Sequence, residues 1–245
     1  STPETATPNI QTAINAAYDG SEVIVLPSSS YYNVSSATLV IKRNIILSGY
    51  TGNYKDVVID ANNKRRVMLI TAKNALVRNV TISRGQGGSN THTPRGASVK
   101  MTGSEIRNCR ITGASGNDGL LAQGIWCENG RVIGCVFDNN KNDKGHCVGL
   151  GIHALGRSAF IDRCVFTNNN STTGFYHWDQ YRIAVVAIYE GTIRNSLIAH
   201  NTYGTASSCG TGVGAIGLYG SAATIENTVV VSNRWKSGEY VNIRG

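Results

Sequence analysis

The sequence predicts an all-β fold, a right-handed parallel β-helix of about eight coils with a short N-terminal capping helix. The first observation behind it is a phrase that recurs six times and is clearest at residues 161–169. A branched aliphatic is followed by two polar or small residues, a slot residue (Cys, Ser, Thr or Val), any residue and a large apolar residue. Because units this short cannot bury an apolar face alone, fixed-period copies indicate stacking. The copies start at Val77, Ile106, Val132, Ile161, Ile193 and Ile225.

The second observation is alternation within each copy. Ile161, Cys164 and Phe166 are the inward candidates, and Gly, Asn and Ser clusters bound the short strands. No helical period occurs in residues 40–245. An antiparallel sandwich is the alternative, but it would not repeat one side-chain pattern at the same place in every unit. A parallel coil is therefore predicted, with about 4.8 Å of height per turn.

One helix is predicted at the start, over residues 9–19. Ile10, Ile14 and Ala17 share one of its faces, Asn9 suits the N-cap, and Gly20 ends it. A strand follows at 22–27. We expect residues 1–8 to be a linker or the remnant of a removed leader, and residues 9–245 to form a single domain. The last residues, 239–245, begin a strand with no visible cap, so either the chain continues or another chain covers this end.

The repeated phrase, the asparagines after it and the opening segment resemble the pectin-lyase-like right-handed β-helix superfamily. Within it they are most similar to bacterial surface or secreted β-helix repeat proteins, over roughly residues 9–245. The resemblance implies a helix over the open end of the solenoid and stacked turn asparagines that bond the backbone and tolerate left-handed conformation. The stacked candidates are Asn140, Asn169, Asn201 and Asn233. The acidic motifs of polygalacturonases are absent, and residues 93–96 hold only a fragment of the pectate-lyase arginine signature.

Three of the six cysteines occupy the same slot of consecutive repeats. Cys109, Cys135 and Cys164 are expected to be buried thiols in one interior column, since free Cys behaves as a small hydrophobe. A disulfide bridge among the other three, Cys127, Cys147 and Cys209, remains open.

The net charge of +8 and pI near 9.3 favour a polyanionic partner, although a generally basic composition would look the same. The basic residues are dispersed rather than run together, and no nucleic-acid-binding motif is present, so we expect no nucleic acid. No apolar run approaches the roughly 18 residues of a membrane span, so no membrane insertion is expected. An acidic polysaccharide is the expected partner.

Long irregular segments follow the later copies, and loops of this length are usually functional or disordered. They are residues 83–96, 112–122, 138–148, 167–183 and 199–212. Each is followed by a small-aliphatic-x strand. If the aliphatic points inward, the next residue points outward. The resulting outward column is Lys100, Trp126, His153, Tyr189 and Gly217.

This column and its loops have the residue types of a polysaccharide groove. In a β-elimination, His153 and Tyr189 would act as base and acid, and Lys100 and Arg182 would hold the carboxylate. The expected substrate-binding residues are Trp126, Trp178, Lys144, His146, His177 and Asp179. The alternative is that these residues only line a solvent-exposed face of the sheet and have no binding role. No cofactor is expected, and Ca²⁺ is a weaker candidate through Asp118, Asp143 and Asp179, which lack a calcium-loop spacing.

Two function classes are predicted. The first is a secreted or surface protein acting on acidic polysaccharide, possibly as a polysaccharide lyase. The second is a non-catalytic glycan-binding or adhesin module of a larger surface protein. Both imply an extracellular or cell-surface location.

Overall fold

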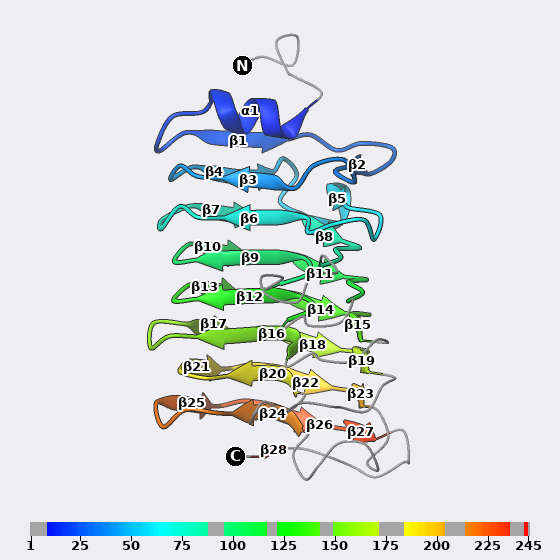
Figure 1. Cartoon of the computed structure of the whole chain (residues 1–245), viewed down its shortest axis with the longest axis vertical. Helices are drawn as coiled ribbons and strands as arrows, with labels where there is room; N and C mark the ends of the chain where they lie inside the picture. Colours follow the sequence, from blue (N-terminus) through cyan, green and yellow to red (C-terminus); the bar gives the residue numbers. More distant parts are fainter. Residues whose placement is uncertain are drawn as a thin grey trace.

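A computed structural model shows a parallel β-helix with one α-helix at its N-terminal end (Figure 1). The structure describes residues 9–87, 96–116, 122–142, 149–171, 184–203, 214–235 and 243–244. Every pairing between the described strands is parallel, which confirms the predicted fold class. Within these residues no helix has the length and apolar character needed to cross a membrane.

Three sheets of eight strands run along the solenoid, and a short fourth sheet lines one corner. Sheet A holds β1 (Glu22–Val25), β4 (Ile46–Gly49), β7 (Leu76–Arg78), β10 (Glu105–Arg107), β13 (Arg131–Ile133), β17 (Phe160–Asp162), β21 (Gly191–Arg194) and β25 (Ala223–Glu226). Sheet B holds β2 (Tyr32–Asn33), β5 (Val58–Asp60), β8 (Thr81–Ser83), β11 (Arg110–Thr112), β14 (Val136–Asp138), β18 (Val165–Thr167), β22 (Leu197–Ala199) and β26 (Val229–Val231). A 3₁₀ turn at Tyr54–Asp56 precedes β5.

Sheets C and D complete each turn. Sheet C holds β3 (Leu39–Ile41), β6 (Met68–Ile70), β9 (Val99–Thr102), β12 (Ile125–Glu128), β16 (Gly149–Leu155), β20 (Ala184–Ile188), β24 (Gly214–Leu218) and β28 (Ile243–Arg244). Sheet D holds β15 (Lys141–Asn142), β19 (Asn170–Ser171), β23 (Thr202–Tyr203) and β27 (Arg234–Trp235). Three of the segments predicted to be irregular therefore contain a regular strand of sheet D near their start. The sequence signal was weak there because each such strand has only two residues.

The repeated phrase supplies one turn of the core from two sheets. Its first aliphatic, as in Ile161, points inward from sheet A, and its large apolar residue, as in Phe166, points inward from sheet B. Equivalent residues stack from turn to turn, and the rings of Phe137 and Phe166 lie 4.5 Å apart at 14°. Between the two strands the chain turns through a left-handed residue, such as Arg163 with φ 52°, immediately before the slot residue.

The slot cysteines form the predicted interior column. Cys109, Cys135 and Cys164 are free, buried thiols that interact with one another. Burial, together with the neighbouring thiols, raises the pKa of Cys135 well above its ordinary value. Cys127 is also a free buried thiol, so no bridge involves it. Cys147 and Cys209 lie outside the described residues.

The turn asparagines form a continuous buried ladder. The side-chain amide of Asn140 donates to Asn169 Oδ1 at 2.9 Å, Asn169 donates to Asn201 at 2.9 Å, and Asn201 donates to Asn233 at 2.8 Å. Each also donates to a backbone carbonyl of a neighbouring turn. The left-handed conformation expected of them belongs instead to the residue before each, as at Asn168 with φ 55°. The ladder asparagines therefore act through hydrogen bonds rather than through backbone tolerance.

The predicted capping helix is present as α1 (Ile10–Ala16). Asn9 is its N-cap, because its side chain accepts from the N–H groups of Gln11 and Thr12. Ile10 and Ile14 are buried against the first turn, and Gly20 takes a left-handed φ of 82° after the helix. The helix thus covers the apolar interior that the first turn would otherwise expose (Figure 1).

Candidate functional site

The outward side of sheet C carries a row of side chains that runs across the strands. In β3, Leu39 and Ile41 are buried and face the core, so Val40 between them faces outward. The strand register then aligns Val40 with the outward residues of the next six strands. In order, the outward row is Val40, Leu69, Lys100, Trp126, His153, Ala187 and Gly217.

Four of the five residues predicted for the outward column belong to this row, and Tyr189 does not. His153 pairs with Ala187, so Tyr189, the residue after β20, lies two positions beyond the partner of His153. Both Val186 and Ile188 could have filled the inward slot opposite Ile152, because they are spaced by two. The structure places Val186 there, after a register shift between Gly149 and Ile152. Tyr189 is therefore not the strand neighbour of His153.

Trp126 and His153 are covered, contrary to the predicted exposed column. Their exposed fractions are 3% and 1%, whereas Tyr189 is 39% exposed. Their rings meet edge to face, with centroids 4.7 Å apart at 67°. The indole N–H of Trp126 donates to Glu128 Oε1 at 2.7 Å, and the Thr102 hydroxyl donates to Glu128 Oε2 at 3.1 Å. Strand alternation predicts the direction in which a side chain points but not its accessibility to solvent.

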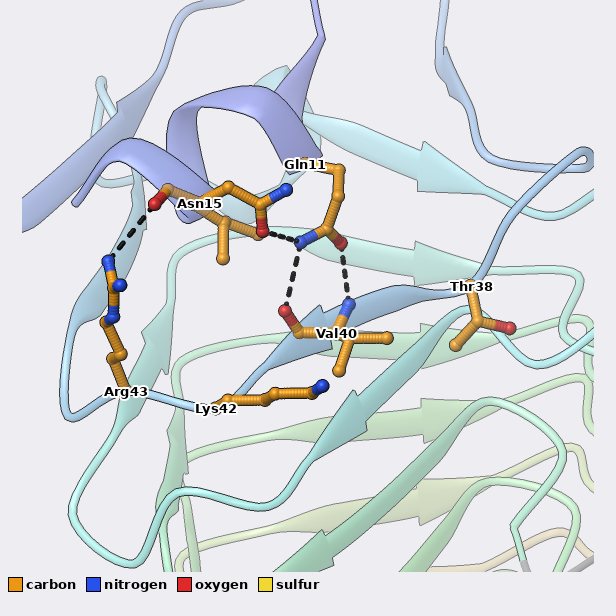
Figure 2. A pocket seen from close by; sticks show the side chains of 7 residues that line it. Gln11, Asn15, Thr38, Val40, Lys42 and Arg43 are labelled. Carbon is orange, nitrogen blue, oxygen red and sulfur yellow. Dashed lines mark hydrogen bonds between the residues drawn. The ribbon is translucent and has the colours of Figure 1, made fainter.

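At the N-terminal end, the outward row reaches a cavity of about 450 Å³ between α1 and β3 (Figure 2). The seven side chains that line it include two cations and no carboxylate. They are Gln11, Ile14, Asn15, Thr38, Val40, Lys42 and Arg43. The sequence did not predict this site, because the site combines a helix and a strand that are about 25 residues apart. A capping helix followed by a basic turn, Lys42 and Arg43, is the sequence feature that could have indicated this site.

Hydrogen bonds hold the walls of the cavity in place. The Gln11 amide pairs with Val40 as a strand would, donating to its carbonyl at 3.1 Å and accepting from its N–H at 2.7 Å. Gln11 also donates to Asn15 Oδ1 at 2.8 Å. Arg43 donates to the carbonyl oxygens of Asn15 and Ala17 at the end of α1, at 3.1 and 2.5 Å. A cation at a helix C-terminus is favourable, so these contacts fix Arg43 at the rim.

Positive charge is concentrated in the first turns of the solenoid. Residues 42–84 contain nine Lys or Arg residues and only two Asp, which accounts for most of the net charge of +8. Two basic groups occur in the turns that flank β3 and β6: Lys42, Arg43 and Lys73 on one side, and Lys64, Arg65 and Arg66 on the other. Counting charge in windows of the sequence would have shown this.

Two of these arginines are tied to the backbone. Arg65 Nε donates to the Ser35 carbonyl at 2.7 Å, and Arg66 Nε donates to the Gly96 carbonyl at 2.8 Å. Partial burial lowers the pKa of Arg66 from its ordinary value, but a guanidinium stays charged at neutral pH. Val40 and Leu69, at the N-terminal end of the outward row, therefore lie between two groups of cations.

Six predicted site residues lie outside the described residues, and no geometry is assigned to them. They are Lys144, His146, His177, Trp178, Asp179 and Arg182. The calcium candidates Asp118, Asp143 and Asp179 also lie outside. Within the described part of the chain, no group of three His, Cys, Asp or Glu side chains is arranged to hold a metal ion.

Comparisons with known proteins add no family. No protein-family model matches the chain, and searches of curated proteins and of solved structures find no significant match. The parallel β-helix is thus established by the structure, and membership of the pectin-lyase-like superfamily remains a hypothesis that rests on the repeats.

Proposed function

We propose that the protein binds an acidic polysaccharide over the partly exposed, N-terminal end of the outward row of sheet C without cleaving it. The observation that carries this proposal is the partly exposed end of the row, Val40, Leu69 and Lys100, which leads to a cavity lined by two cations and no carboxylate. Trp126, His153, Ala187 and Gly217 are buried, so the accessible part of the row covers three neighbouring strands, or about 10 Å. A polymer along the solenoid axis would meet Lys100 and the two basic groups beside β3 and β6.

Electrostatics would supply most of the attraction in this proposal. Carboxylates on successive sugars face several cations at once, and a field of one sign concentrates a polyanion at the surface. Trp126 offers little ring face, because only 3% of its surface is exposed. Ion pairing and hydrogen bonding are therefore expected to outweigh aromatic stacking.

Lyase activity on the same polymers is the less favoured alternative. A lyase needs a base within hydrogen-bonding reach of the proton that it removes. His153 is 1% exposed, and Ala187 rather than Tyr189 is its partner on the next strand. This arrangement does not present an acid–base pair to a bound sugar, so the binding module is favoured. Such a partner belongs outside the cell, which makes an extracellular or surface location part of the proposal.

The test uses the full chain with immobilised polygalacturonate, alginate and hyaluronate, and with neutral dextran as control. We expect retention on at least one acidic polymer at low salt, weak retention on dextran, and loss of retention as salt shortens the screening length. Equal retention on dextran, or none on any acidic polymer, would overturn the proposal. Absorbance of the unsaturated uronate product is followed in parallel, and its appearance would replace the binding module by the lyase.

A further inference from the structure

We propose that the cavity between α1 and β3 is a terminal subsite that takes the carboxylate-bearing sugar at one end of an acidic oligosaccharide. This inference rests on the proposed function. It adds the part of the ligand that the cavity binds, the direction of the ligand along the outward row, and a residue that determines specificity. The cavity volume of about 450 Å³ falls within the size range of small-molecule sites.

The charge of the cavity selects an anion. Lys42 and Arg43 line it, and no Asp or Glu does. Arg43 already donates hydrogen bonds to carbonyl groups at the end of α1. Lys42 has neither a hydrogen bond nor an ion pair with any residue that the structure describes. Its side chain lies alongside Val40 in the cavity, so its ammonium is the group available to a carboxylate (Figure 2).

Neutral polar groups in the same cavity suit sugar hydroxyls. The Oδ1 atom of Asn15 accepts from Gln11, which leaves its Nδ2 group to donate. The Thr38 hydroxyl donates to the Arg66 carbonyl at 2.9 Å, and its oxygen can still accept. One ammonium with a nearby donor and acceptor matches a ring that carries both a carboxylate and hydroxyls.

The capping helix α1 makes the cavity a closed end of the outward row. α1 lies over β3, the first strand of sheet C, so the outward row does not continue beyond it (Figure 1). The Gln11 amide also occupies both backbone groups of Val40 on this edge. An added peptide strand would need those groups, so the cavity does not suit β-strand addition.

The experiment measures affinity for the uronate trimer of whichever polymer is retained, by calorimetry on the full chain. Lys42→Gln should lower affinity for the trimer about tenfold, as expected for loss of a charge-assisted hydrogen bond. Lys55→Gln is the matched control, because it removes the same charge from an exposed residue in the 3₁₀ turn, outside the cavity. The trimer with its carboxylates reduced to alcohols should bind at least as weakly to the native protein as the charged trimer does to Lys42→Gln.

A second measurement does not depend on variants. Brief acetylation of the native protein should modify Lys42 and Lys55, and the trimer should protect Lys42 but not Lys55. If a polymer is retained but Lys42 is not protected, or Lys42→Gln behaves as Lys55→Gln does, the subsite is wrong and the wider proposal stands. If no acidic polymer is retained, both fail.

Discussion

Trp126 and His153 occupy the same outward position on neighbouring strands, and their rings meet edge to face with centroids 4.7 Å apart. Both are nearly fully covered although they point away from the core. The pair therefore behaves as a small second core on the outer side of sheet C. Glu128 extends it by accepting from the Trp126 indole N–H.

This pairing predicts that His153→Ala lowers stability. The substitution removes a buried aromatic contact, and such truncations cost about 2–4 kcal/mol. Tyr189→Ala, at a side chain that is 39% exposed, should cost less than about 1 kcal/mol. Urea unfolding followed by circular dichroism gives both values. Equal losses for the two variants would contradict the covered position of His153.

The asparagine ladder predicts a contrast between two adjacent residues. Asn169→Ala removes a buried amide that bonds Asn140, Asn201 and the Phe137 carbonyl, so we expect a loss of about 2–4 kcal/mol. Asn168→Gly should be within about 0.5 kcal/mol of the native protein or more stable, because Asn168 has a φ of 55° that glycine adopts freely. The same unfolding measurement decides, and a similar cost at both positions would argue against the ladder.

Repetition explains what could be predicted from the sequence. A column such as Cys109, Cys135 and Cys164 repeats at one place in each turn, so six copies of a weak pattern combine into a firm prediction. Tyr189 was misplaced because a strand with aliphatics at both Val186 and Ile188 permits two registers, and only pairing with Ile152 selects one. The cavity at α1 occurs once, and it depends on where a helix rests, which periodicity does not encode.

Burial of thiols predicts a stability that falls at alkaline pH. Burial raises the pKa of Cys127 from 9.0 to about 12, so the folded protein keeps a proton that the unfolded chain releases. This contribution is intact below pH 9 and is lost as the pH rises from about 9 towards 12. The slope is at most about 1.4 kcal/mol per pH unit for one thiol.

Cys127→Ala isolates this contribution from other groups that titrate in the same range. The difference in unfolding free energy between the native protein and the variant should shrink as the pH rises from 8 to 10.5. Native-state labelling at pH 8 should leave Cys109, Cys127, Cys135 and Cys164 unmodified, because all four are buried. A difference that stays constant with pH, or rapid labelling of these thiols, would show that they are accessible.

The outward row predicts a specific role for Lys100 in polymer binding. Lys100 lies between Leu69 and Trp126, is partly exposed, and forms no hydrogen bond or ion pair with the residues that the structure describes. Its ammonium is thus available to a ligand that follows the row. Lys100→Gln should lower affinity for the retained acidic polymer about three- to tenfold at low salt.

The salt dependence of that loss separates a local contact from a general charge effect. A contact at Lys100 should cost more than Lys55→Gln at every salt concentration, because both variants change the net charge equally and only Lys100 belongs to the row. Both losses should shrink between 0.05 and 0.5 M salt, where the screening length falls below about 10 Å. Fluorescence anisotropy with a labelled oligomer that is long enough to span several turns gives the affinities. Identical losses for the two variants would mean that the polymer responds to overall charge, and the outward row would no longer be its path.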